Sequence, residues 1–173
     1  MFRAIGIATS VLLIALMPRA AGHQPKEHSG TSVRVASISF VPQKFDLSGN
    51  TDRLEQALRR ASQGGAQIAV APEGALDGYV VNEIIAGKVP AERMHEVAIP
   101  IDHAIIQRFQ NIARQLQLCV VFGFAEQVDD DVFNCAVFID DQGAIRGKQH
   151  KMQFAEGYHR SWWFCLLYTS PSP

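Results

Sequence analysis

Two charged residues with complementary chemistry each stand at the carboxyl end of an apolar, strand-like segment. Glu73 follows the apolar run 66–71, and Lys151 ends the run 144–151. A third charged residue, Glu126, ends another such strand. In open α/β sheets, functional groups gather where the strands end and the chain leaves the sheet. A carboxylate beside a lysine can there act as a general base, while the lysine opposes negative charge that develops on a substrate.

Both positions also have explanations that involve no catalysis. A glutamate directly after Pro72 can begin a helix, because the helix dipole favours a carboxylate in the first turn. A lysine at the end of a strand is most often solvated. Since functional groups are a minority of titratable ones, position alone does not decide between these alternatives for Glu73 and Lys151.

The elements that must position these residues begin with a strand, a helix and a second strand. The β-branched run VRVASISF, residues 33–40, predicts the first strand. A helix is expected from Asn50 or Thr51 to Gln63, where a Gly-Gly pair ends it. The short all-apolar run 66–71 is typical of a strand that is covered on both faces. The apolar face of the helix consists of Leu54, Ala57, Leu58 and Ala61.

The second part of the chain predicts a loop, a helix and three strands. Residues 79–99 are expected to form a loop with short helices. Residues 101–117 predict the strongest helix, because apolar residues recur there at steps of three and four. Strands are expected at 118–126, 132–140 and 144–151, separated by the turns VDDD and DDQG. The order predicts an α/β (α+β) fold with helices on at least one face of a sheet.

Four segments occur in an order that is informative as a set. They are VRVASISF, APEGALDGY, VVFGFAE with DVFNCAVFIDDQGAI, and GKQHKMQF. Over residues 33–164 they resemble the carbon–nitrogen hydrolase (nitrilase) superfamily, with its Pro-Glu…Gly-Tyr segment, Gly-x-x-Glu strand and Tyr-Arg-Lys-x-His-Leu segment. The chain departs from the last pattern at Gln149-His150 and at Gln153. The resemblance implies the N-terminal part of a carbon–nitrogen hydrolase domain, an incomplete half of an α-β-β-α sandwich.

The resemblance also implies roles for individual residues. Members of the family use a Glu–Lys–Cys triad, in which a thiolate attacks an amide or nitrile carbon and forms a thioester. Glu73 matches the general base, and Lys151 matches the lysine that stabilises the oxyanion. Glu126 matches a glutamate that helps to order the site, and Asn134 matches a hairpin asparagine with a structural role. Aromatic residues that either line a substrate pocket or belong to a core or interface are Tyr79, Tyr158, Trp162 and Trp163.

The cysteine nucleophile of that triad is missing from the sequence. Cys119 and Cys135 precede Lys151 and lie in apolar stretches typical of buried thiols, and a disulfide between them is not favoured because their strands do not place them opposite each other. Cys165 follows Lys151 too early. Residues 165–173, CLLYTSPSP, resemble a translated transposon-type sequencing adapter, with a genuine Ser/Pro-rich tail as the alternative. We therefore expect natural sequence to end at residue 164, and the polypeptide as written to be inactive and poorly soluble.

The N-terminus predicts export. A basic start, an apolar run and a small-residue exit at Ala20 and Gly22 are typical of a secretory signal peptide over residues 1–22, with a polar linker at 23–32. The alternative is a membrane anchor, but the run is shorter than the roughly 20 apolar residues that a spanning helix needs. We expect a secreted or periplasmic protein without a stable membrane span after cleavage.

Composition narrows the class of function. The hydrophobic fraction of 47% indicates a globular protein, and a net charge of −1 without a basic block argues against a nucleic-acid partner. The cysteine and histidine spacing predicts no metal site, and no cofactor is expected. The leading hypothesis is a homo-oligomeric hydrolase of a small amide or carbamoyl-amide, or of a nitrile. The alternatives are a non-catalytic binding protein on the same fold and an acyltransferase of the superfamily.

Overall fold

The computed structural model describes residues 32–152. Within this range five strands form one sheet in the order β1-β2-β3-β4-β5. The first three strands are parallel, and the last three form two antiparallel pairs. This confirms the predicted α/β class and the predicted order of strands. The strands are β1 (Val35–Ser37), β2 (Ile68–Val70), β3 (Cys119–Val128), β4 (Asp131–Ile139) and β5 (Ile145–His150).

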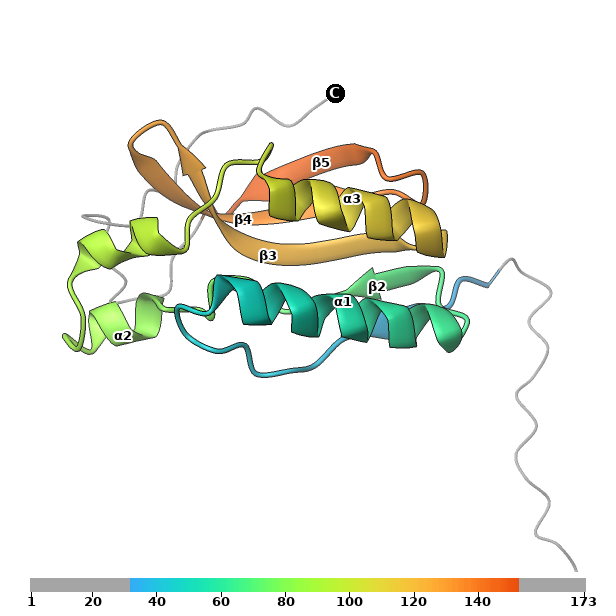
Figure 1. Cartoon of the computed structure of the whole chain (residues 1–173), viewed down its shortest axis with the longest axis horizontal. Coiled ribbons are helices and arrows are strands. Elements are labelled where there is room, and N and C mark those ends of the chain that lie inside the picture. The colour runs from blue at the N-terminus through green and yellow to red at the C-terminus, as the bar shows by residue number, and fades with distance from the viewer. Residues whose placement is uncertain (1–31, 153–173) are drawn as a thin grey trace, which may run out of the picture. The chain divides into compact units, whose positions relative to one another are not determined.

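Two long helices, α1 (Leu47–Gln63) and α3 (Ala104–Leu116), lie on the same side of the sheet (Figure 1). Both belong to crossovers between parallel strands that advance in the same direction along the sheet. Since such crossovers are right-handed, the two helices must cover the same face. Between them and the sheet lies the main core, in which the rings of Phe109 and Phe122 have centroids 4.8 Å apart.

Helix α1 begins earlier than the sequence predicts. Asp46 is its N-cap, and the Asp46 carboxylate accepts a hydrogen bond of 2.9 Å from the Gly49 backbone N–H. Asn50, where the start was expected, is buried inside the first turns, and its side chain donates a hydrogen bond of 2.9 Å to the Leu76 carbonyl. The predicted end and the predicted apolar face, including Leu54, are confirmed.

The segment between β2 and α3 contains two short helices, as expected for residues 79–99. They are α2 (Val81–Ile85) and the 3₁₀ helix η1 (Ala91–Glu96). Their buried residues form a second core cluster with Ala125 and Val132 near the β3–β4 hairpin. No helix among residues 32–152 has both the length and the apolarity needed to cross a bilayer.

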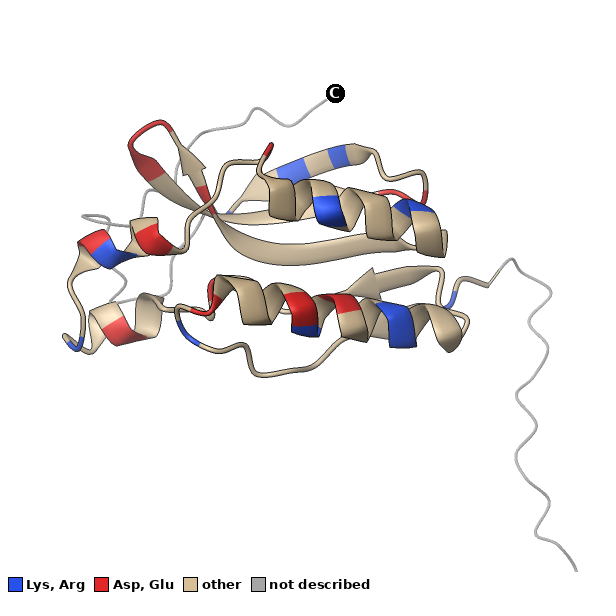
Figure 2. Ribbon diagram, viewed as in Figure 1, with Lys and Arg blue, Asp and Glu red and all other residues tan. Residues whose placement is uncertain are grey.

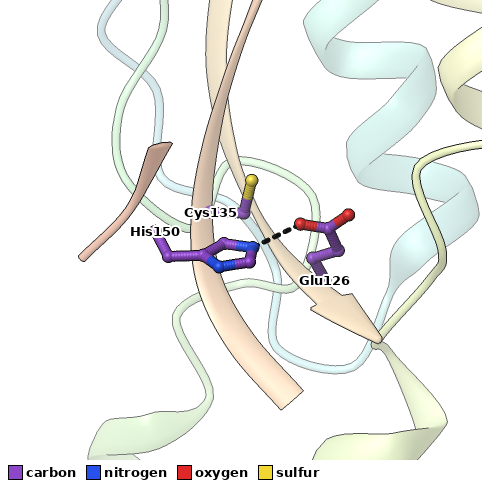
Figure 3. Close-up of side chains that lie close together, drawn as sticks. All are labelled: Glu126, Cys135 and His150. Carbon is purple, nitrogen blue, oxygen red and sulfur yellow. Dashed lines mark hydrogen bonds and ion pairs between the residues drawn. The ribbon is translucent and has the colours of Figure 1, made fainter. Parts of the chain in front are cut away.

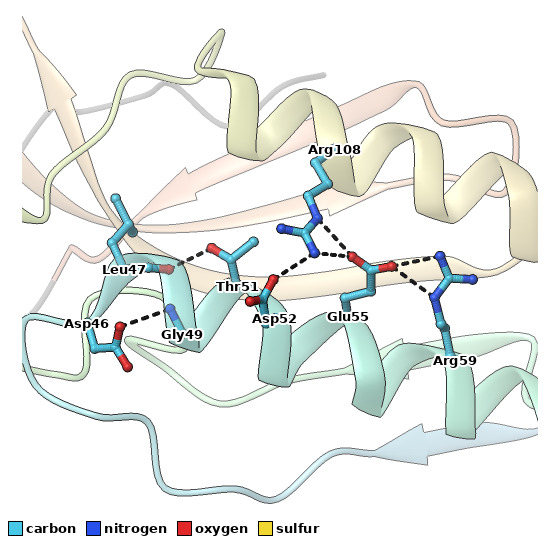
Figure 4. A network of polar contacts seen from close by, with 8 residues as sticks. All are labelled: Asp46, Leu47, Gly49, Thr51, Asp52, Glu55, Arg59 and Arg108. Carbon is cyan, nitrogen blue, oxygen red and sulfur yellow. Dashed lines mark hydrogen bonds and ion pairs between the residues drawn. The ribbon is translucent and has the colours of Figure 1, made fainter.

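Charged residues of both signs lie along the two long helices (Figure 2). Arg108 of α3 donates hydrogen bonds to Asp52 and Glu55 of α1, at 2.8 Å from the Asp52 oxygen, and Arg59 binds the same Glu55 (Figure 4). The network joins the helices on their solvent side. Exposed pairs of this kind contribute about 0–1 kcal/mol each, so the buried apolar faces rather than these charges hold the helices on the sheet.

The sheet face opposite the helices is called here the open face. Side chains alternate along each strand, so that Ala69 points to the helices while Val70 points away. Val70 is 38% exposed and Phe138 of β4 is 37% exposed. Residues 66–71 are predicted to form the kind of strand that a complete domain covers on both faces; the described residues cover only the helix side of the sheet, as expected for an incomplete half of the sandwich.

The β3–β4 register settles the pairing of the two cysteines. Cys135 lies opposite Phe124, and Cys119 lies at the other end of β3. Cys135 points to the helix side, whereas Cys119 is on the opposite face, next to Val120 of the core. Both thiols are free, which confirms that no disulfide joins them.

Candidate active site

Glu73 lies in a tight turn directly after β2, and no helix begins there. Residues 73–77 form the turn, and Gly74, Gly78 and Tyr79 within and after it have φ values of 63°, 81° and 50°. At Gly78 an added Cβ would lie 2.4 Å from the Gln43 carbonyl oxygen, so only glycine fits. The alternative in which Glu73 starts a helix and interacts with its dipole is therefore wrong.

A glycine in β3 fixes how closely this turn approaches the sheet. An added Cβ at Gly123 would lie 2.9 Å from the Glu73 Cα and 2.9 Å from the Gly74 nitrogen. Any side chain there would push Glu73 away from the open face. Sequence reasoning missed the role of Gly123, although a glycine inside a strand is a recognised sign of close backbone approach.

Three of the residues singled out in the sequence meet on the open face. Lys151 Nζ donates a hydrogen bond of 2.8 Å to Glu73 Oε1, and Asn134 Nδ2 donates one of 2.5 Å to the same oxygen. The Lys151 backbone N–H also bonds to the Asn134 carbonyl at 2.8 Å. The carboxylate, the amide and the lysine come from the turn after β2, from β4 and from the end of β5. The arrangement brings together residues 78 positions apart in sequence.

The electrostatics of this group keep Glu73 ionised. Burial raises the pKa of its carboxyl, but hydrogen bonds from Lys151, Asn134 and the Tyr79 side chain lower it more, so the pKa lies below its ordinary value of 4.5. The Glu73 side chain remains 45% exposed and that of Lys151 34%. An ionised and accessible carboxylate that is paired with a cation can accept a proton from a substrate or a nucleophile.

A cavity of about 340 Å³ opens beside this pair. Its floor is made of small or apolar residues of β3 and β4, including Val121 and Ala136, and its polar rim comes from Glu73, Asn134 and Lys151. Concave sites with an apolar floor and a few convergent polar groups are the usual places where small molecules bind.

Glu126 does not belong to this group. Its register position opposite Phe133 puts its side chain on the helix side of the sheet, where it is 1% exposed. It binds the Lys148 ammonium, and the His150 Nε2 lies 2.6 Å from its other oxygen. Burial raises the pKa of Glu126, and the hydrogen bonds from Lys148 and His150 lower it below its ordinary value. Any ordering of the catalytic site by Glu126 therefore acts through other residues.

Cys135 completes this buried cluster, whose ligand-type atoms all lie within 4.8 Å of one another (Figure 3). Burial, followed by the Glu126 charge, raises the pKa of the Cys135 thiol. A thiol that stays protonated is a poor nucleophile, and Lys148 pairs with the Glu126 carboxylate. The chemistry of the cluster is that of a buried ion pair, and Cys135 points away from the cavity side of the sheet.

The predicted aromatic group is described only in part. The Tyr79 side chain forms a hydrogen bond with the Glu73 carboxyl and so stabilises the carboxylate. Tyr158, Trp162 and Trp163 lie outside the described residues, as do the signal-peptide segment 1–22 and the tail 165–173 that the sequence predicts.

A further buried carboxylate, Asp77, was not anticipated from the sequence. It is 1% exposed, and its carboxylate accepts a hydrogen bond of 2.9 Å from the Tyr79 backbone N–H. Burial raises the pKa of Asp77 to about 6, against the lowering effect of backbone N–H groups that include those of Val80 and Ala125. Asp77 thus holds the turn that carries Glu73.

Comparison with known families agrees with the fold and with the order of these segments. The family model for carbon-nitrogen hydrolases matches residues 34–162. The match covers most of the chain, which therefore belongs to the carbon–nitrogen hydrolase (nitrilase) family.

Curated relatives include nitrilases of plants and archaea. The chain is 26% identical over 133 residues to the bifunctional nitrilase/nitrile hydratase of Lupinus angustifolius, covering 72% of this chain and 38% of that protein. It is 31% identical over 121 residues to a nitrilase of Pyrococcus abyssi, covering 69% of this chain and 43% of that protein. The chain therefore spans less than half the length of these relatives.

Solved structures show the same fold. A double mutant of an amidase from Nesterenkonia sp. AN1, in complex with acrylamide, superimposes with a TM-score of 0.61 at 24% identity, over 80% of this chain and 50% of that one. A variant of that amidase with butyramide gives a TM-score of 0.59 at 25% identity, over 77% of this chain and 48% of that one. The five-stranded α/β unit thus corresponds to about half of an amidase of the nitrilase superfamily.

Proposed function

We propose that the complete protein hydrolyses a small linear amide by a Glu–Lys–Cys mechanism, with Glu73 as general base and Lys151 as the oxyanion-stabilising residue. By the complete protein we mean the product of the gene read past the codon for Phe164. The observation that carries the proposal is the contact of 2.8 Å between Lys151 Nζ and Glu73 Oε1 at the rim of the cavity.

The proposed reaction begins with the transfer of a thiol proton to Glu73. The resulting thiolate adds to the amide carbon, and the Lys151 ammonium opposes the negative charge that forms on the carbonyl oxygen. The intermediate collapses to a thioester, and the leaving nitrogen takes the proton from Glu73 and departs as ammonia or an amine. Glu73 then removes a proton from water, which attacks the thioester and releases the acid and the thiol.

We propose that the thiol comes from natural sequence that continues beyond Phe164 in place of the tail 165–173, and not from Cys165 of that tail. Cys135 points to the helix side of the sheet, and Cys119 lies at the far end of β3 from the Glu73 turn. The resemblance puts the nucleophile after the lysine, on a strand and turn of its own. In the Nesterenkonia amidase, a variant with acrylamide added covalently at the active-site cysteine has been determined.

The substrate class rests on a choice between two groups of relatives. The solved amidase binds acrylamide and butyramide, and the small apolar residues that floor the cavity suit a short acyl chain of this kind. The second candidate is a nitrile, which is favoured by the nitrilases among the relatives at 26–31% identity. Both reactions use the same base, cation and thiol.

We also propose that the protein is exported through the N-terminal signal peptide and assembles as a homo-oligomer. The support for export is the sequence pattern of residues 1–22. N-terminal sequencing of the protein recovered from culture medium or periplasm should give His23 as the first residue. A membrane-bound protein that still begins at Met1 would show that the N-terminal segment is an uncleaved membrane anchor and not a signal peptide.

The experiment that tests the proposed function is a cloned extension of the gene followed by an assay. The complete protein should carry a cysteine within a few tens of codons after Phe164 and should release ammonia from butyramide faster than from butyronitrile. Faster turnover of butyronitrile would favour the nitrilase candidate. Serine or alanine in place of the cysteine, together with no turnover of either compound, would favour a binding protein.

A further inference from the structure

The C-terminal end of strand β5 is held by a buried contact on the helix side of the sheet. His150 is 6% exposed, and its Nε2 lies 2.6 Å from Glu126 Oε2 (Figure 3). Its ring also stacks on Phe133, with centroids 4.5 Å apart and planes at 11°. Lys148, two residues earlier and on the same face, binds the other oxygen of the same carboxylate. One buried glutamate thus holds two alternate residues of β5.

Little else holds the end of this strand. In the described part of the chain β5 pairs only with β4, and Arg146, Gly147, Lys148 and Gln149 are all exposed. The backbone bond from Lys151 N–H to the Asn134 carbonyl is the last of the ladder. The contacts of His150 therefore carry much of the attachment at the point where β5 ends.

Alternation along the strand couples this anchor to the open face. Successive side chains point to opposite faces, so a His150 fixed on the helix side directs Lys151 towards Glu73. The same two backbones carry both contacts, because Asn134 donates to Glu73 and accepts from Lys151 N–H. Release of His150 would let the strand end move and would lengthen the Lys151–Glu73 contact.

We propose that His150 is a positioning residue, which holds the Lys151 ammonium against Glu73 by anchoring β5 to Glu126. His150 itself does not touch the cavity. It stands where the family pattern has an arginine, and its imidazole supplies a short, stacked donor to the same carboxylate that Lys148 neutralises. The kinetic part of the test rests on the proposed function, whereas the position of Lys151 can be measured without turnover.

The test compares His150→Leu, which removes the donor, with His150→Gln, which keeps an N–H donor at a similar reach. The control is His95→Leu on the exposed surface of η1. In the complete protein, each lysine is acetylated with a limiting amount of acetic anhydride, and the extent at each site is read by peptide mass spectrometry. Lys151 should react several-fold faster in His150→Leu, return towards the wild-type rate in His150→Gln, and not change in His95→Leu. Lys88, which is 65% exposed, serves as the internal reference.

Kinetics give the second readout. His150→Leu should lower kcat at least tenfold with a change in KM below about threefold, because the cation acts on charge that develops after substrate has bound. His150→Gln should recover most of kcat. An unchanged rate of Lys151 acetylation in a folded His150→Leu variant would overturn the proposal.

Two further outcomes are informative. If wild type shows no turnover but Lys151 acetylation responds as expected, the positioning role stands and the proposed function fails. If His150→Leu does not fold, His150→Asn takes its place, because its amide is too short to reach Glu126 as the imidazole does. Faster Lys151 acetylation in His150→Asn supports the anchor, and an unchanged Lys151 rate would overturn it.

Discussion

Each face of the sheet carries one carboxylate that pairs with a lysine, and the two carboxylates differ in their exposure to solvent. On the helix side, Glu126 is 1% exposed and binds both Lys148 and His150. On the open face, Glu73 binds Lys151 and Asn134, and its side chain is 45% exposed beside a cavity. In each case hydrogen bonds from a lysine and a second donor lower the pKa of the carboxyl more than burial raises it.

The comparison shows that access decides what a carboxylate–lysine pair can do. Both carboxylates stay ionised at neutral pH, but only Glu73 can meet a substrate. The buried pair instead fixes strands to one another, at a desolvation cost that good geometry must offset. We expect substitutions on the open face to change turnover directly, and substitutions on the helix side to change stability and, through the anchoring of β5, the position of Lys151.

The largest effect outside Glu73 is expected at Lys151. Lys151→Met in the complete protein should lower kcat/KM for butyramide by about 10²–10³-fold, because the oxyanion loses its cation. Steady-state ammonia release measures this. Lys88→Met, at an exposed site, should leave activity unchanged. Retention of Lys151→Met activity within threefold of wild type would contradict the oxyanion role.

Asp77 extends the comparison to a buried carboxylate whose partners in the described chain are backbone amides. Its pKa is raised from 3.8 to about 6, so its contribution to stability is fully present below pH 3.8 and is lost as pH rises through about 6. The loss amounts to about 3 kcal/mol. Asp77→Asn should therefore show a smaller fall in the free energy of unfolding between pH 4 and 7. Equal pH profiles from urea titrations of the two proteins would show that Asp77 is not buried as described.

Glu126 should affect stability as well as the position of Lys151, because it holds the end of β5. Glu126→Gln removes the charge that Lys148 and His150 share, and should lower the free energy of unfolding by about 2 kcal/mol; the effect is smaller than for two fully buried partners because Lys148 is 37% exposed. Urea denaturation measures it, with the exposed Glu92→Gln as control. A change in the free energy of unfolding below about 0.5 kcal/mol would mean that the ion pair on the helix side does not stabilise the fold.

The smallest effect is expected from the charged network on the helices. Arg108→Ala removes the contacts to Asp52 and Glu55, and should cost less than about 1 kcal/mol and less still at high salt. Thermal melts at low and at high salt test this. If the free energy of unfolding fell by more than about 2 kcal/mol at both salt concentrations, the network would contribute more to stability than exposed ion pairs normally do.

Much of the fold follows from the sequence, because apolar periodicity and turn residues report local structure. The helix over residues 101–117 and the three strands that follow it were placed within a few residues. The start of α1 was missed, since Asp46 is an N-cap and Asn50 also looks like one. An all-apolar run such as 66–71 predicts burial without saying which residues supply it, and the described residues supply it only on the helix side.

The candidate site was predictable only where resemblance supplied long-range information. Glu73 and Lys151 are 78 positions apart; their places at strand ends allowed them to meet, and the resemblance to the family's triad indicated that they do. Glu126 shows the limit of this reasoning, because a shift of one residue decides which face a strand residue occupies. The roles of Gly123 and His150 depend on strand register, which no local pattern in the sequence reports.

The most direct test of the account is turnover by Glu73→Gln in the complete protein. Without the base the thiol keeps its proton, and ammonia release from butyramide should fall by about 10³-fold or more, while the free energy of unfolding changes by less than about 1 kcal/mol. Glu92→Gln, at an exposed site, should match wild type. Turnover by Glu73→Gln within tenfold of wild type would contradict the assignment of Glu73 as the general base.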